Sequence, residues 1–153
     1  MQITLPNDLT TISEMAFYDC YSLVRVVIPD SVTTIENGAF SGCTGLTGIT
    51  VPSSVTSMGT SVFSGCTGLT SVSLPETMTF IGRRCFRECT NLESMYLPDS
   101  ITTIGDNTFY YCQKLIITHL PYSLTTVGAS VFYHVRSISA VTSSSIGVAV
   151  PIW

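Results

Sequence analysis

The 153-residue chain carries little charge and has no long apolar run, and these two absences already exclude several classes of protein. Charged residues make up 10% of the sequence, against about 25% in a typical globular domain. Ten acidic and six basic residues give a formal net charge of -4, which leaves no broad basic surface for nucleic acid or anionic lipid. No stretch approaches the roughly 18 apolar residues of a membrane-spanning helix. We therefore expect neither nucleic-acid binding nor membrane insertion.

Several short motifs are missing as well. Residues 1–10 show neither the basic segment nor the apolar segment of a secretory signal, so we expect no signal peptide in this chain. No N-x-[ST] glycosylation acceptor occurs, and compartment stays unknown from the residues. His119 and His134 are the two histidines, and no G-x-S-x-G, H-E-x-x-H or P-loop motif accompanies them. The sequence indicates no enzyme, no cofactor and no metal site.

What the sequence has in place of such motifs is a repeat with a period of 23 residues. The stretch FSGCTGLT occurs at 40–47 and again, letter for letter, at 63–70. Proline, phenylalanine, cysteine and leucine each recur at the same step over most of the chain. The columns contain Pro6, Pro29, Pro52, Pro75, Pro98 and Pro121; Phe17, Phe40, Phe63, Phe86, Phe109 and Phe132; Cys20, Cys43, Cys66, Cys89 and Cys112; and Leu23, Leu46, Leu69, Leu92, Leu115 and Ile138. Fixed-period self-similarity of this length is typical of stacked repeat architectures.

Each repeat combines two kinds of apolar spacing. In residues 69–75, LTSVSLP, apolar and polar residues alternate before a proline, which predicts a strand that ends there. Further on, Ile81, Cys85, Phe86 and Cys89 follow a helical spacing over about two turns, which predicts a short helix or 3₁₀ turn. One unit of 23 residues cannot bury such a stripe alone, so the units must stack.

The predicted fold is an α/β solenoid in which each repeat adds one strand to a single parallel sheet and one short helix or 3₁₀ turn. We expect one domain over residues 1–153, with adjacent columns about 4.8 Å apart. The predicted repeats are 5–27, 28–50, 51–73, 74–96, 97–119 and 120–142, followed by an irregular tail, 143–153.

This repeat resembles the BspA-type (Treponema-like) leucine-rich repeat, whose unit reads LPxxVTxIGxxAFxxCxxL. The match extends over nearly the whole chain and recurs six times. The resemblance implies a curved leucine-rich-repeat solenoid with a binding role and no catalytic residues. Family members are mainly surface proteins of bacteria and some protists, often implicated in adhesion, so cell-surface or secreted localisation is implied by the resemblance only.

Two columns allow a functional or a structural interpretation. Cys85 and Cys89 have the C-x₃-C spacing of a metal or redox pair, but no second pair accompanies them, and buried thiols acting as small hydrophobic groups are the alternative. An unbroken threonine column suits either an ice-ordering array or an extended turn whose hydroxyls bond neighbouring backbone. Its members are Thr10, Thr33, Thr56, Thr79, Thr102 and Thr125.

Binding residues are expected on the outward positions of the strand row, the face predicted to be concave, because solenoids use that extended surface. The outward positions are Arg25, Val27, Gly48, Thr50, Ser71, Ser73, Ser94, Tyr96, Ile117, His119, Ala140 and Thr142. The candidates for ligand contact are Arg25, Thr50, Ser71, Ser73, Ser94, Tyr96, Ile117 and His119. We expect Tyr96, Ile117 and His119 to form one mixed patch, since tyrosine is enriched at binding hot spots. An ordinary solvated sheet face is the alternative.

The sequence therefore predicts a non-catalytic binding module for a protein or glycan ligand, possibly in cell-surface adhesion. The competing hypothesis is a structural spacer, or part of a longer repeat array, with no ligand of its own. Three arginines, Arg83, Arg84 and Arg87, cluster on one predicted helix, and Arg83 and Arg84 are expected near Glu88 at helical spacing. The first and last repeats lack evident polar caps, so self-association through uncapped ends is also expected.

Overall fold

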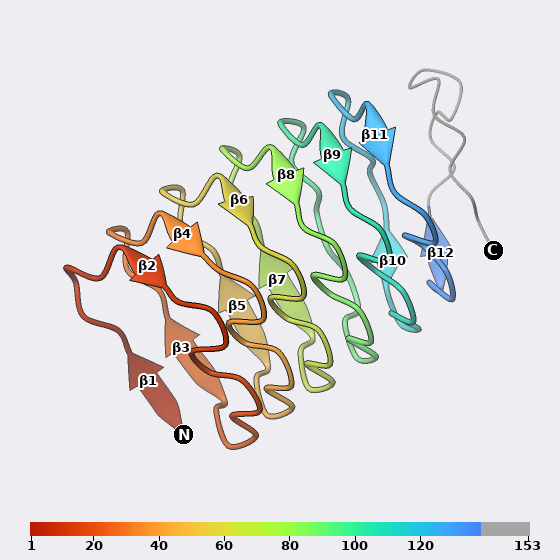
Figure 1. The fold of residues 1–153 in the computed structure, drawn as a ribbon. Coiled ribbons are helices and arrows are strands. Elements are labelled where there is room, and N and C mark those ends of the chain that lie inside the picture. The colour runs from red at the N-terminus through yellow and green to blue at the C-terminus, as the bar shows by residue number, and fades with distance from the viewer. Residues whose placement is uncertain (139–153) are drawn as a thin grey trace.

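The computed structural model describes residues 1–138, which form a β-solenoid of about six coils with a repeat near 23 residues (Figure 1). The coils stack side by side from the N-terminus to the last strand, so residues 23 positions apart are spatial neighbours. The predicted tail, 143–153, and the outward positions Ala140 and Thr142 lie outside the described residues. The family of stacked columns predicted from the sequence is confirmed.

Within residues 1–138 the chain forms twelve short strands in two rows (Figure 1). The first row, which ends near the prolines, consists of β1 (Gln2–Thr4), β3 (Arg25–Val27), β5 (Gly48–Thr50), β7 (Ser71–Ser73), β10 (Ile116–Ile117) and β12 (Ser137–Ile138). The second row consists of β2 (Thr11–Ile12), β4 (Thr34–Ile35), β6 (Ser57–Met58), β8 (Phe80–Ile81), β9 (Thr103–Ile104) and β11 (Thr126–Val127).

The first row was predicted to be one parallel sheet, but it consists of three two-stranded pieces. β1 pairs with β3, β5 with β7, and β10 with β12, all parallel. Ser94 bridges the last two pieces by single contacts to Ser71 and Ile116. The fourth repeat therefore contributes a bridge to this row in place of a strand.

The continuous six-stranded sheet is the second row, which the sequence did not predict. Its strands are parallel and ordered β11-β9-β8-β6-β4-β2. Each is only two residues long, too short to show an alternating pattern, with one side chain facing the core, as at Ile35 and Ile81. The threonine column lies just before this row, and its hydroxyls donate to the carbonyl of the preceding repeat at Thr33, Thr102 and Thr125 (3.1–3.3 Å). The backbone-bonding interpretation of these three threonines is thereby confirmed.

The short helices predicted for each repeat are wrong, because residues 1–138 contain no helix. Two positions per repeat, four residues apart, have a left-handed backbone, as at Arg84 (φ 55°) and Glu88 (φ 60°), and this interrupts a right-handed helix. The amides between them bond the next coil instead, as Phe63 N–H does to the Cys85 carbonyl (2.8 Å) and Phe86 N–H to that of Thr108 (3.0 Å). The segment is thus a run of turns that forms a third ladder between coils, and the fold is all-β.

The core runs along the inside of the coils as uninterrupted columns. The phenylalanine rings stack with centroids 5.1–5.9 Å apart and interplanar angles of 3–10°. Beside them, each cysteine thiol from Cys43 to Cys112 donates to the carbonyl of a phenylalanine 26 residues earlier, at 3.0–3.1 Å. The columns fill the interior and leave the outward side chains of the first row as the face available to a ligand.

Candidate ligand-binding face

The predicted first-row residues mostly face solvent. Six of the eight candidates are exposed: Arg25, Thr50, Ser71, Ser73, Ser94 and Tyr96. His119 is half-buried, and its ring lies against Tyr96. We call the solvent-facing side chains of this row, including those that follow each proline, the first-row face. Alternation along the strands explains the pattern, since Val26, Ile49 and Val72 turn inward between exposed neighbours.

Ile117 was predicted to face outward, and this is wrong. Its side chain is fully buried, while Thr118 is exposed. The repeat of 23 would place the polar Thr118 in the core, but Ser94 bridges Ile116 with a step of 22, so the register slips by one residue. Such a slip exchanges the two faces of a strand and brings the apolar Ile117 inside.

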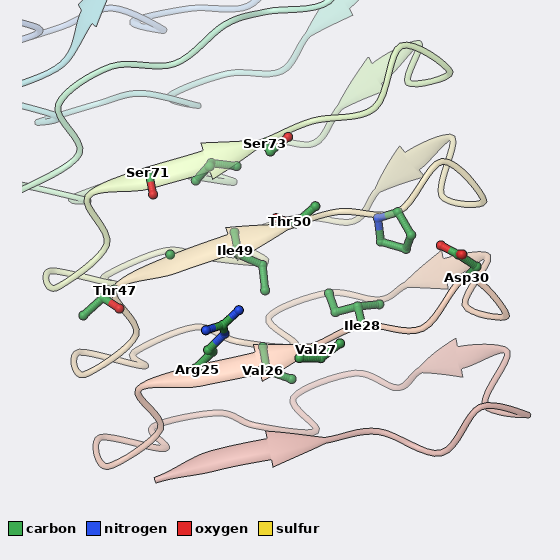
Figure 2. Close-up of a pocket in the computed structure, with 13 residues that line it drawn as sticks. Arg25, Val26, Val27, Ile28, Asp30, Thr47, Ile49, Thr50, Ser71 and Ser73 are labelled. Carbon is green, nitrogen blue, oxygen red and sulfur yellow. The ribbon is translucent and has the colours of Figure 1, made fainter.

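The first three repeats contain a shallow hollow of about 580 Å³ on this face (Figure 2). Candidates Arg25, Thr50, Ser71 and Ser73 line it, as does Asp30. Gly48 lies between Arg25 and Ser71 in the same column and contributes no side chain, which is why the surface is recessed there. In Figure 2 the Arg25 side chain extends from β3 toward β5. This hollow is separate from the predicted Tyr96 patch and was not predicted as a cavity.

A compact aromatic patch lies over the fourth and fifth repeats. The rings of Tyr96 and His119 stack with centroids 5.6 Å apart and planes 11° from parallel. Tyr122 meets the other side of the imidazole edge-on, at 5.2 Å and 73°. Tyr96 is 51% exposed and Tyr122 77% exposed, so two tyrosines present ring surface to solvent around one histidine.

Asp99 fixes this arrangement. Its Oδ1 lies 2.7 Å from His119 Nε2 and accepts a hydrogen bond from the Tyr122 backbone N–H at 3.0 Å. These bonds, the backbone one foremost, hold the pKa of the Asp99 carboxyl below its usual value. Partial desolvation, and then the carboxylates of Glu76 and Asp99, raise the pKa of Tyr96. The patch therefore combines rigid aromatic rings with an ionised carboxylate.

Asp99, Tyr122 and Glu76 were missed as site residues because the prediction considered only the strand positions. The signal was available: all three follow a repeat proline directly, at Pro75, Pro98 and Pro121. This column borders the strand ends, so its side chains reach the same face.

The arginine cluster lies on the turn segment between Ile81 and Cys89, and its pairing differs from the prediction. Arg83 binds Asp106 of the next repeat (3.1 Å), and Arg87 binds Glu88 (2.9 Å). Without a helix, Glu88 is not one turn away from Arg83 and Arg84. The predicted aromatic stack is present there, with Tyr110 and Tyr133 centroids 5.0 Å apart and the Arg87 guanidinium 5.4 Å from the Tyr110 ring.

The cysteines behave as buried hydrophobic groups. Five of the six are fully buried free thiols, including both Cys85 and Cys89. Cys20 was predicted buried but is only half-buried, because no preceding coil covers the first repeat. Among residues 1–138 no three His, Cys, Asp or Glu side chains gather into a group that would hold a metal ion. None of the helices that could cross a membrane is found in that part of the chain either.

These features define a class of protein: a parallel β-solenoid repeat protein with an exposed aromatic and hydroxyl-bearing face. The model of the BspA type leucine rich repeat region matches six copies, over residues 1–116 and 34–148. The chain belongs to the BspA-type leucine-rich repeat family.

Two solved structures of similar chains agree with this assignment. A leucine-rich repeat protein from Bacteroides ovatus is 31% identical over 88% of this chain, with a TM-score of 0.69. The T. pallidum leucine-rich repeat protein is 30% identical over 87% of the chain, with a TM-score of 0.75. The chain spans 41% of the first protein's length and 75% of the second's. No curated protein matches the sequence.

Proposed function

We propose that this chain is a non-catalytic binding module that recognises a protein or glycan through the first-row face, with its centre at Tyr96 and His119. The observation that supports this most is the stacked, exposed pair of rings held in place by Asp99. Rigid tyrosines lose little conformational entropy on binding and are frequent hot spots. Membership of a repeat family with surface proteins favours adhesion at the cell surface as the setting, which we propose along with it.

Binding is favoured over catalysis because of where the polar groups lie. His119 does have an acidic neighbour, Asp99, as a catalytic pair would require. The hollow lined by Arg25, Thr50 and Ser73, however, lies over other repeats, and its lining includes neither of these two groups. The His119–Asp99 pair instead supports the ring on which Tyr96 stacks.

The proposal is tested by probing arrays of extracellular-matrix proteins and of glycans with the purified chain. Three versions are compared: the wild type, Tyr96→Ala, and a triple variant with Arg83, Arg84 and Arg87 changed to alanine. For any partner found, Tyr96→Ala should weaken binding by about 1–3 kcal/mol, as expected for an interface anchor. The triple variant should change it by less than about 0.5 kcal/mol, because surface substitutions outside an interface are usually near neutral.

The result that would overturn the proposal is a partner lost by the arginine variant and retained by Tyr96→Ala. If no array member binds any version, the spacer hypothesis is favoured instead. We also propose that residues 1–153 act as one domain and that solenoid ends self-associate. Light scattering over a range of concentrations checks the second point, and a strictly monomeric chain would contradict it.

A further inference from the structure

One face of the Tyr96 ring is covered and the other is open. The His119 imidazole covers the side toward the next coil, with ring centroids 5.6 Å apart and nearly parallel planes. On the opposite side the neighbour is Ser73, because Ser71 bridges Ser94 and the two residues further along stay in register. A serine side chain reaches only as far as its hydroxyl, so it leaves the outer part of the tyrosine face uncovered, and Tyr96 stays 51% exposed.

A carboxylate borders this open face. Glu76 follows Pro75 at the end of the same coil as Ser73, is exposed, and forms no ion pair with any of residues 1–138. Its charge acts on the Tyr96 hydroxyl, as does that of Asp99. A ligand group against the open face thus meets a ring, a hydroxyl and an unpaired negative charge together.

The ring itself is held firmly. Asp99 binds the imidazole behind Tyr96 at 2.7 Å and the Tyr122 backbone at 3.0 Å, so His119 is fixed from two sides. A ring fixed before binding loses less entropy when a partner docks.

We propose that this slot, formed by Tyr96, Ser73 and Glu76, binds an arginine side chain of a protein partner. A guanidinium is planar and stacks on an aromatic face, and its fork of donors matches a carboxylate, so one arginine satisfies both sides of the slot. The Ser73 hydroxyl accepts a further hydrogen bond. Glu76 and Asp99 repel anionic groups here, and sugars have no guanidinium. This inference rests on the proposed function and names the partner class for the same face.

The test uses fluorescence anisotropy with labelled peptides of four Arg-Gly units, and with Lys-Gly and Glu-Gly peptides of the same length, at low ionic strength. The Arg-Gly peptide should bind more tightly than Lys-Gly, and Glu-Gly should not bind. Tyr96→Ala and Glu76→Gln should each weaken the Arg-Gly complex about two- to fivefold, the range of exposed cation–π contacts and ion pairs. Tyr96→Phe, which keeps the ring face, should stay within about twofold of wild type.

Glu14→Gln is the matched control, because Glu14 is also exposed and its loss changes the net charge equally, far from the slot. It should leave the affinity unchanged. Arg-Gly binding that is absent, or that is unaffected by Tyr96→Ala and Glu76→Gln, would overturn the inference, as would equally tight binding of Glu-Gly.

The two proposals fail differently. A partner from the arrays that needs Tyr96, but is neither weakened by Glu76→Gln nor displaced by the Arg-Gly peptide, would overturn the arginine slot and leave the binding face standing. A partner that binds Tyr96→Ala as tightly as wild type would overturn the binding face.

Discussion

Individual residues in this chain are constrained by their equivalents 23 positions away. Gly82 shows this most sharply: a Cβ at this position would lie 2.1 Å from the Gly59 carbonyl oxygen of the preceding coil. Gly65 has the left-handed conformation (φ +70°), yet the nearest atoms to its added Cβ are 3.9 Å away. Asp19 and Tyr111 occupy the equivalent left-handed position in other coils. The two glycines are therefore required for different reasons.

Alanine substitutions separate these reasons. Gly65→Ala should cost about 1–2 kcal/mol of unfolding free energy, the strain of a side chain in the left-handed region. Gly82→Ala should cost about 3 kcal/mol or more, because backbone atoms of two coils must move apart. Urea unfolding of both variants checks this. If Gly65→Ala proved as damaging as Gly82→Ala, close packing between coils would not be the cause.

At the same scale, the sequence predicted most of the exposed site residues but not all of their partners. Strand alternation was enough for Tyr96, Ser94 and Ser73. It failed at Ile117, because a register slip that exchanges Ile117 for Thr118 depends on which side chain the core accepts. Asp99 required knowing that the residue after the proline curves back toward the strand face.

Among the elements, the turn segment departs furthest from what its sequence indicated. The spacing of Cys85, Phe86 and Cys89 suits a helix, but a series of turns with left-handed residues brings the same three side chains inward. Apolar spacing alone cannot distinguish the two, since the amides are satisfied between coils in place of within a helix. The second-row strands were missed because two residues carry no period.

Hydrogen exchange tests the three-ladder arrangement. The amides of Phe40, Phe63 and Phe86, which donate to the next coil at 2.8–3.0 Å, should be protected as strongly as second-row amides such as Glu36, which donates to Ile12 (2.9 Å). Protection requires opening of the coil because each bond joins two repeats. Fast exchange at the three phenylalanine amides, with slow exchange confined to the first-row strands, would contradict the structure.

The cysteine column makes stability depend on pH in the alkaline range. Burial raises the pKa of the Cys43 thiol to about 11 and the pKa of the Cys85 and Cys112 thiols to about 12. Unfolded thiols ionise near pH 9, so above that pH the unfolded chain binds fewer protons than the folded one. Stability is therefore complete below about pH 9 and falls as pH rises toward 11–12.

A Cys85→Val/Cys112→Val variant measures this contribution, since valine occupies the equivalent positions 62 and 135. Above pH 9 each buried thiol should contribute a loss of about 1.4 kcal/mol per pH unit. Urea unfolding between pH 8 and about 10.5 should thus show a slope shallower by about 2.7 kcal/mol per pH unit in the variant. Equal slopes in the two proteins would mean that these thiols ionise in the folded state.

For the whole molecule, charge and aromatic groups are distributed unevenly along the solenoid. The first-row face has a recessed, hydroxyl-lined part over the first three repeats and a protruding aromatic part over the next two. Most of the bases lie elsewhere, with Arg83, Arg84 and Arg87 on the turn segment of one coil. A partner that spans several repeats can engage both parts of the first-row face at once, which one coil alone does not allow.

Site-specific photo-crosslinking tests the assignment of this face most directly. Benzoylphenylalanine is placed at Ser94, beside Tyr96 on the first-row face, or at Arg84, which is exposed on the turn segment. With a partner from the arrays, irradiation should crosslink the chain labelled at position 94 and give little or no product at position 84. Crosslinking at position 84 alone would contradict the account and place the ligand on the turn segment.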